Sequence, residues 1–328
     1  MFNVREHITN QIIAALEAPG GVPPWRKGWT SGLAINAVTG KPYQGVNQLL
    51  LGISPHGGDC RWATYKQAKA AGYGVREGEK STKIVRMVEV PRSQPEEAKD
   101  GEIVATGKDS MLVMRTYDVF NASQIEGMPP IPSKINPVEA VAAADAILGG
   151  LMADGLKMVH GGRHAYYKVK EDCIQIPDRR DFHSTEDFYS TALHEAAHAT
   201  GAKKRLDRLG MTVRFGTPAY AKEELRAELT AAILGAGMGL TLGETHIRNH
   251  ASYVGSWLEV LRSDKSEIFK AAAAAQHAVD WLKGHALEVK PQAEAATEIT
   301  PDVPARLPEA ENKDEKPGRK RRVAGMRA

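Results

Sequence analysis

Cysteine is scarce in this sequence, and long apolar runs are lacking. Only Cys60 and Cys173 occur among 328 residues, far apart and outside any paired motif. A disulfide framework and a cysteine-based zinc site are thereby excluded, and both cysteines are interpreted as free thiols. No apolar run approaches the length that crosses a bilayer, and residues 1–10 carry Glu6 and lack a signal-peptide core. We therefore expect a cytoplasmic protein without a membrane partner.

Charge is nearly balanced over the whole chain but not along it. The net charge is +3, and the chain is 42% hydrophobic and 25% charged, a composition typical of soluble globular proteins. Residues 61–92 nevertheless contain eight Lys or Arg against three acidic residues. The basic excess therefore belongs to the N-terminal part.

The order of predicted elements indicates an α+β fold with two domains. We expect a small α+β domain over 1–128, a Pro-rich linker over 129–137, and a mainly helical domain with a short sheet over 138–285. The segment 286–328 is rich in Pro, Ala, Glu and Lys and ends in a basic cluster, which predicts disorder. A solubilising role is favoured for this tail over a nucleic-acid contact.

Apolar periodicity and turn residues locate the individual elements. Helices are predicted over 4–16, 43–51, 64–71, 137–151, 219–234, 244–263 and 266–282; strands are predicted over 83–90, 110–120, 166–170 and 172–176, with 93–109 as a hairpin loop. The last two strands precede a helix over 190–201. Their place in the chain is the usual position of the edge strand along which a metalloprotease places its substrate.

That helix carries the motif H-E-x-x-H, formed by His194, Glu195 and His198. One turn apart, the two imidazoles face the same way and suit one Zn²⁺, while Glu195 lies beside them. A carboxylate that is not a ligand accepts the proton of a water activated by the metal, so Glu195 is the predicted catalytic base. The alternative is a core helix with incidental histidines, because five-residue motifs arise by chance.

A third ligand is expected from residues 222–228, which read K-E-E-L-R-A-E. Glu224 and Glu228 lie on one helical face, and Glu223 points about a third of a turn away. We assign Glu224 as the third ligand and Glu228 as the carboxylate that accepts the other ring proton of a ligating histidine. This pattern is similar to that of thermolysin-like gluzincins, with one Zn²⁺ per chain. The two roles could be exchanged, or both groups could be solvated. Four side chains are candidates to stabilise an oxyanion: His164, Tyr166, Tyr167 and His250.

Aromatic residues alternate with cations in the N-terminal part. Stacking platforms beside a basic groove hold single-stranded DNA without sequence preference. The alternative is that the aromatics are core residues and the charges form a solvated face; Trp25 and Trp29, in a Pro/Gly-rich loop, are the two expected to be exposed. The candidate DNA contacts are Trp25, Arg26, Lys27, Trp29, Tyr43, Trp62, Tyr65, Lys66, Lys69, Lys80 and Lys83.

Further motifs span nearly the whole chain: Pro24-Trp25, Asn36 to Tyr43 continuing to Asn47, Trp62 to Gln67, Val119 to Asn121, His194 to Arg208, and His250 to Trp257. With these motifs the chain resembles the ArdC-type antirestriction proteins of conjugative plasmids. The resemblance implies a domain that binds single-stranded DNA, shared with TraC-type plasmid primases and including Asn47, joined to a zincin-like metallopeptidase domain. It further implies protection of incoming DNA from type I restriction.

Three hypotheses remain. The first is a DNA-binding metallopeptidase in antirestriction, with a restriction-system component as a possible protein substrate. The second is a non-catalytic protein that masks single-stranded DNA and has a structural or vestigial zinc site. The third is a toxin or transcription-factor protease that uses DNA for localisation. Glu195 favours catalysis, because a structural metal site needs no general base.

Overall fold

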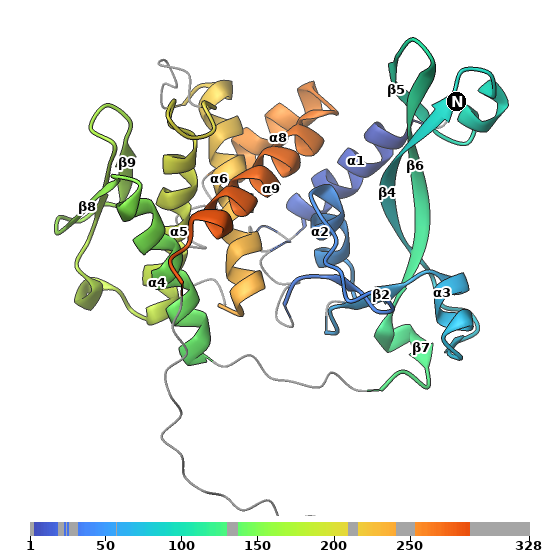
Figure 1. Ribbon diagram of the computed structural model, residues 1–328, viewed down its shortest axis with the longest axis horizontal. Coiled ribbons are helices and arrows are strands. Elements are labelled where there is room, and N and C mark those ends of the chain that lie inside the picture. The colour runs from blue at the N-terminus through green and yellow to red at the C-terminus, as the bar shows by residue number, and fades with distance from the viewer. Residues whose placement is uncertain are drawn as a thin grey trace, which may run out of the picture. The chain divides into compact units, whose positions relative to one another are not determined.

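The computed structural model describes residues 3–18, 23, 25, 32–56, 58–129, 137–208, 216–240 and 253–288 (Figure 1). Residues 1–289 cluster as one compact unit. Helices and sheets are mixed, so the α+β prediction is confirmed. In the described residues, no helix combines the length and apolar character that a membrane span requires.

The first helix, α1 (Val4–Leu16), begins where predicted. The Asn3 side chain accepts a hydrogen bond from the Glu6 backbone N–H, which is the usual way to satisfy a free donor in the first turn. Residues at helical spacing bury one face, among them Ile8 and Ile12. The helix therefore packs through the apolar stripe that the sequence shows.

The larger sheet is built around a long antiparallel pair, β4 (Thr82–Pro91) and β6 (Ser110–Asn121), as predicted. The sheet order is β1-β2-β6-β4, with β1 at Ile35–Asn36, β2 at Arg61–Ala63, and β5 (Glu102–Thr106) also paired with β6. The prediction of a loop over 93–109 is wrong, because this stretch contains β5 and the short helix η2 (Pro95–Ala98). They were missed because most of their residues are exposed and the stretch around them is polar.

Short helices complete this part of the chain. The helix α2 (Val46–Gly52) begins later than predicted, because Gly45 has φ of 56° and ψ of −133°, which is not helical. The helix α3 (Tyr65–Ala70) is confirmed, with a reciprocal cap between Thr64 and Gln67. A second cap starts η3 (Ala122–Gln124), and β3 (Gly74–Val75) pairs with β7 (Ile125–Glu126).

The C-terminal part contains a three-stranded sheet in the order β8-β10-β9. The strands β9 (Tyr166–Lys168) and β10 (Cys173–Ile176) were predicted, whereas β8 (Lys157–His160) was missed. The strand β10 pairs in parallel with β8 and antiparallel with β9, so β9 lies at an edge. It contacts the helix that carries the histidines.

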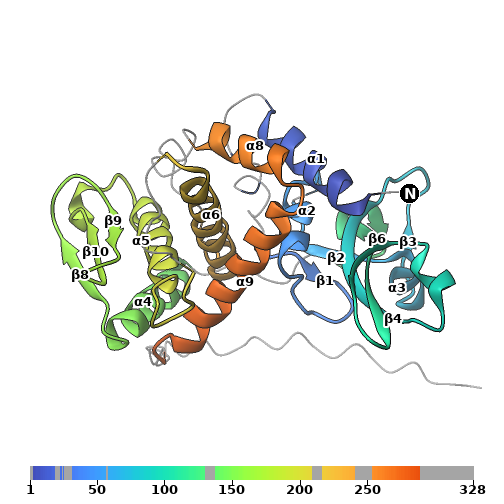
Figure 2. The same ribbon diagram turned by 90° about the horizontal axis from the view of Figure 1, so that it is seen from above.

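The described residues of this part also form five helices and one short turn: α4 (Pro137–Ala153), η4 (Arg179–Asp181), α5 (Thr185–Thr200), α6 (Pro218–Met238), α8 (Val254–Ser263) and α9 (Glu267–His285). Figure 2 shows α5, α6 and α9 packed together, with α1 against α8. The part of the predicted helix 244–263 before residue 253 lies outside the described residues, as do 130–136 of the linker and 289–328 of the tail.

The main hydrophobic core is shared between the two predicted domains. One buried cluster contains Ile8 and Trp25 together with Leu225 and Trp257. Smaller clusters lie within the N-terminal sheet. The boundaries 1–128 and 138–285 stay predictions, and the helices on either side of them pack into a common interior.

Candidate functional site

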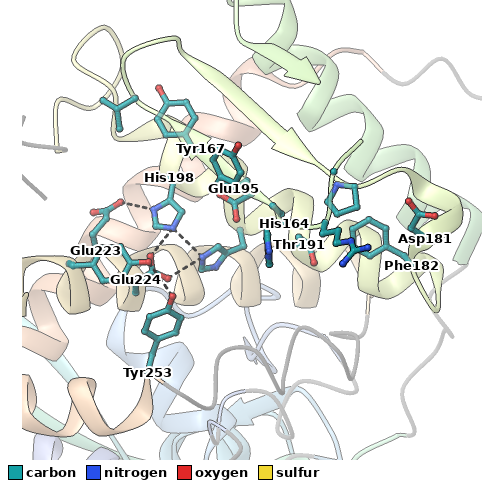
Figure 3. A pocket seen from close by; sticks show the side chains of 18 of the residues that line it. His164, Tyr167, Asp181, Phe182, Thr191, Glu195, His198, Glu223, Glu224 and Tyr253 are labelled. Carbon is teal, nitrogen blue, oxygen red and sulfur yellow. Dashed lines mark hydrogen bonds and ion pairs between the residues drawn. The ribbon is translucent and has the colours of Figure 1, made fainter. Parts of the chain in front are cut away.

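The helix α5 presents both histidines of the motif on one face. It begins at Ser184, whose side chain accepts from the Asp187 N–H, and its apolar face is buried. His194 and His198 therefore lie one turn apart, with their Nε2 atoms 3.1 Å apart (Figure 3). Two ring nitrogens this close can bind the same ion.

The helix α6 brings a carboxylate to that point. It begins with Thr217 as N-cap and Pro218 in its first turn, close to the predicted start at 219. The two oxygens of Glu224 lie 3.5 Å from His194 Nε2 and 3.4 Å from His198 Nε2. The ligand atoms of these three residues all fall within 4.8 Å of one another. The structure thus brings together the three residues that were predicted as ligands.

The opposite ring nitrogens face two further carboxylates. His194 Nδ1 is 3.9 Å from Glu228 Oε2, and His198 Nδ1 is 3.4 Å from Glu223 Oε1. Carboxylates behind ligating histidines orient the rings and raise their basicity. The role of Glu228 stays a prediction, and its position fits that role. Glu223 was assigned no role, because its place on α6 alone directs it away from Glu224.

Glu223 is itself held by an arginine. Arg208 donates to both oxygens of Glu223, to the hydroxyl of Thr200 at 2.9 Å and to the carbonyl of Ala197 at 2.6 Å. One guanidinium therefore ties the end of α5 to α6. Glu223 thus pairs with Arg208 and with His198, and Arg208 fixes the carboxylate that faces His198 Nδ1.

The electrostatics of the pocket follow from burial and these ion pairs. Burial would lower the pKa of His198, but hydrogen bonds to Glu223 and Glu224 outweigh it and raise the pKa to about 10. Burial opposes ionisation of Glu224, but the two histidines hold its pKa well below the usual range. Burial, with the nearby charge of Glu224, raises the pKa of Glu195 to about 7.

The donor set fits a divalent cation. Glu195, Glu223, Glu224 and Glu228 are all buried around the two imidazoles. Arg208 balances Glu223, which leaves three buried carboxylates beside two imidazoles. A divalent ion would offset two of their three negative charges. Nitrogen and oxygen donors of this kind suit Zn²⁺ and similar ions.

The histidines line a cavity of about 1110 Å³. Of the predicted oxyanion donors, His164, Tyr166 and Tyr167 line it, and His250 lies outside the described residues. The Tyr167 hydroxyl donates to Asp172 Oδ1 at 2.7 Å. The sequence reasoning did not select Tyr220 and Tyr253, which also line the cavity and have their hydroxyls 3.1 Å apart. Tyr220 lies one helical turn before Glu224, a spacing that could have identified it.

The predicted DNA contacts divide into four groups. Arg26, Lys27 and Trp29 lie outside the described residues. Tyr65, on α3, is 55% exposed, and Lys66, Lys69 and Lys80 are exposed as well. Tyr43 is partly buried, and Lys83 pairs with Asp118 at 2.9 Å. The exposed residues of α3, Tyr65, Lys66 and Lys69, are called the α3 surface below.

The fourth group of predicted DNA contacts, Trp25, Trp62 and Asn47, holds the fold together. The expected exposure of Trp25 is wrong, because its ring is fully buried against Trp257. Trp62 is buried with Leu51 and Val119, so neither tryptophan presents a face on which a base could stack. The Asn47 amide exchanges two hydrogen bonds with the backbone of Val85 on β4, both 2.8 Å long.

Comparisons with known proteins match the two parts separately. Residues 2–120 match the N-terminal domain of anti-restriction factor ArdC, and residues 142–274 match a zincin-like metallopeptidase family. A protein described as DNA primase TraC, from Escherichia coli, is 39% identical over 84% of this chain. The chain spans only 27% of that primase's length. The uncharacterized protein y4eC of Sinorhizobium fredii is 37% identical over 85% of this chain and 91% of its own length.

Two solved structures match most of this chain. The metal-free crystal structure of the antirestriction protein ArdC from plasmid R388 is 34% identical, with a TM-score of 0.69 over 87% of this chain and 98% of ArdC. The Mn(II)-bound structure of ArdC is 33% identical, with a TM-score of 0.69 over 88% of this chain and 100% of ArdC. Similarity in sequence and fold over the full length of ArdC shows that the chain belongs to the ArdC family of antirestriction proteins, with a zincin-like metallopeptidase domain.

Proposed function

We propose that this chain is a DNA-binding metallopeptidase that protects incoming plasmid DNA from type I restriction during conjugation. Its N-terminal half binds single-stranded DNA, and its pocket holds one Zn²⁺ and cleaves a cytoplasmic protein such as a restriction-system component. One observation carries the proposal: His194, His198 and Glu224 converge on one point in a large cavity. Membership in the ArdC family supports the biological role.

The residues of the pocket have separate chemical tasks. A bound Zn²⁺ would supply Lewis acidity, which lowers the pKa of a water and polarises a substrate carbonyl. Glu195 lies beside the ligands, and a backbone hydrogen bond from Tyr167 reaches its carboxylate. Its pKa of about 7 suits a group that accepts a proton from water and returns it to the departing amine at neutral pH.

Tyr253 is placed to stabilise the oxyanion. Burial and the hydrogen bond with Tyr253 raise the pKa of Tyr220, and burial raises that of Tyr253, so both hydroxyls keep their protons. Tyr220 hydrogen-bonds Glu224, so the Tyr253 hydroxyl is the one that we propose as donor to an oxyanion. Both side chains line the cavity, and Figure 3 shows Tyr253 close to Glu224. Donors aimed at developing negative charge are a main source of rate acceleration.

A substrate peptide is proposed to lie along β9. This strand is the edge of its sheet, and its residues Tyr166 and Tyr167 line the cavity. An edge strand offers backbone donors and acceptors to an extended peptide, which then adds as a further strand. This arrangement would place a scissile carbonyl within reach of α5.

Substitution of Glu195 by Gln tests the catalytic proposal. The amide keeps the size of the side chain but cannot accept the proton, so cleavage should fall about 100- to 10,000-fold. Bound metal and DNA affinity should stay unchanged. Glu186→Gln, in the first turn of the same helix, is the matched control and should retain cleavage. Proteolysis of candidate restriction subunits and protection of transferred DNA are measured together.

DNA masking without catalysis is the second candidate function. The exposed Tyr65, Lys66 and Lys69 favour it, because a stacking ring beside two cations binds a strand without any metal. The Glu195→Gln variant separates the two functions. Full protection of DNA by that variant would show that proteolysis is not the route.

A further inference from the structure

Four aromatic rings form a row from the N-terminal segment to the metal pocket. The ring centroids of Trp25 and Trp257 are 6.0 Å apart, those of Trp257 and Tyr253 are 6.3 Å apart, and those of Tyr253 and Tyr220 are 6.0 Å apart. Each separation lies in the range of directly packed aromatic pairs. We call these four residues the aromatic row.

The two ends of the row belong to different parts of the protein. Trp25 falls within residues 2–120, which match the N-terminal domain of ArdC. At the other end, Tyr220 and Tyr253 line the cavity, and Tyr220 hydrogen-bonds Glu224. The position of a residue that contacts the metal pocket therefore depends on packing supplied by the N-terminal region.

Packing around the tryptophans leaves little room for movement. Trp25 and Trp257 are both 0% exposed, and both belong to the main core cluster. Because protein interiors are close-packed, a shift of one ring displaces its neighbour. Tyr253 directly precedes α8, the helix that carries Trp257, so the two residues move with the same backbone.

The N-terminal region is also fixed to the same helices by hydrogen bonds. The Thr9 hydroxyl donates to the carbonyl of Lys265 at 2.6 Å, and the Lys265 ammonium donates to Asn10 Oδ1 at 3.0 Å. These contacts lie between α1 and the turn that joins α8 to α9. They would carry a displacement of α1 to the backbone that holds Tyr253.

We propose that Trp25 and Trp257 are positioning residues of the metal pocket, which hold Tyr253 and, through it, Tyr220 against Glu224. The proposal rests on the proposed metal site. It makes the N-terminal region part of the peptidase site, so the two parts function as one unit. Metal affinity then depends on a ring that belongs to the N-terminal region and does not touch the ligands.

The test measures Mn²⁺ affinity of the full-length chain, freed of metal, by titration followed by electron paramagnetic resonance of the free ion. Trp25→Leu and Trp257→Leu should weaken Mn²⁺ binding by about 2- to 30-fold, the range usual for residues that couple two sites. Trp25→Phe should restore most of the affinity, because it keeps a ring in the row. Trp62→Leu is the control, since Trp62 is equally buried but lies in a separate cluster.

Each outcome has a distinct meaning. Wild-type affinity in Trp25→Leu, or an equal loss in Trp62→Leu, would overturn the proposal. If the leucine variants do not fold, Trp25→Phe and Trp257→Phe decide together, with Trp62→Phe as their control. A small loss of Mn²⁺ affinity in both that is absent from Trp62→Phe supports the proposal, and wild-type affinity in both contradicts it. A wild-type chain that binds no Mn²⁺ would instead refute the proposed metal function.

Discussion

The metal pocket and the α3 surface differ in how their side chains are fixed. His194 and His198 form buried ion pairs with Glu224, and their opposite ring nitrogens pair with Glu228 and Glu223. By contrast, Tyr65, Lys66 and Lys69 extend into solvent from a six-residue helix. Buried charges must be paired, so each pocket residue depends on its neighbours. Exposed residues act almost independently. Substitutions should therefore have large, coupled effects in the pocket and small, separable effects on the α3 surface.

The largest effect is expected from loss of a ligand. Glu224→Ala removes the carboxylate that faces both Nε2 atoms, and metal affinity should fall by more than the ~100-fold that loss of an outer partner costs. Glu228→Ala should cost no more than about 100-fold by the same principle. Metal analysis of both purified variants measures this difference. Loss of metal only in Glu228→Ala would reverse the two assignments.

A smaller loss is expected from Glu223→Gln. The neutral amide no longer stabilises the ring proton at His198 Nδ1, and it weakens the ion pair with Arg208. Metal affinity should fall about 10- to 100-fold with the fold retained. Isothermal titration with Zn²⁺ measures it, with Glu186→Gln as control. An unchanged affinity would show that the position of His198 does not depend on Glu223.

Metal affinity should also increase with pH. Hydrogen bonds to Glu223 and Glu224 raise the pKa of His198 to about 10 in the metal-free protein, so His198 carries a proton at neutral pH that a cation must displace. Release of one proton makes the apparent Kd fall about tenfold per pH unit between pH 6 and 8. Titrations in buffers of different ionisation enthalpy count the protons. A Kd that does not change with pH would mean that His198 is already neutral.

The same contrast explains what could be predicted from the sequence. The two histidines were found because helical spacing on α5 alone places them together. Glu224 was selected because its spacing from Glu228 on α6 is similar to that of thermolysin-like enzymes. Glu223 was missed, because its contact with His198 arises from the packing of α6 against α5 and not from either helix alone. Local periodicity carries no information on how two helices cross.

The N-terminal part shows the limit of composition as a guide. Pro and Gly around Trp25 predicted an exposed loop, yet the ring fills space beside Trp257, more than two hundred residues later in the chain. The strands β5 and β8 were missed because most of their residues are exposed, so neither has the pattern of a buried strand. The predicted helix over 64–71 was confirmed, because its start has a local cause in the cap that Thr64 forms with Gln67.

The smallest effect is expected on the α3 surface. Tyr65→Ala removes one stacking ring, and the affinity of the full-length chain for a single-stranded oligonucleotide should fall about tenfold, within the ~1–3 kcal/mol per stacked base. Tyr166→Ala is the control from the other region, because Tyr166 is 44% exposed against 55% for Tyr65. It should leave DNA affinity unchanged, and Tyr65→Ala should leave metal affinity unchanged. Fluorescence anisotropy measures the DNA affinity at fixed salt. If Tyr65→Ala binds DNA like wild type, stacking on α3 is not how the protein holds a strand. If it also weakens metal binding, the two regions are not separable, and the difference in burial does not predict how substitutions propagate.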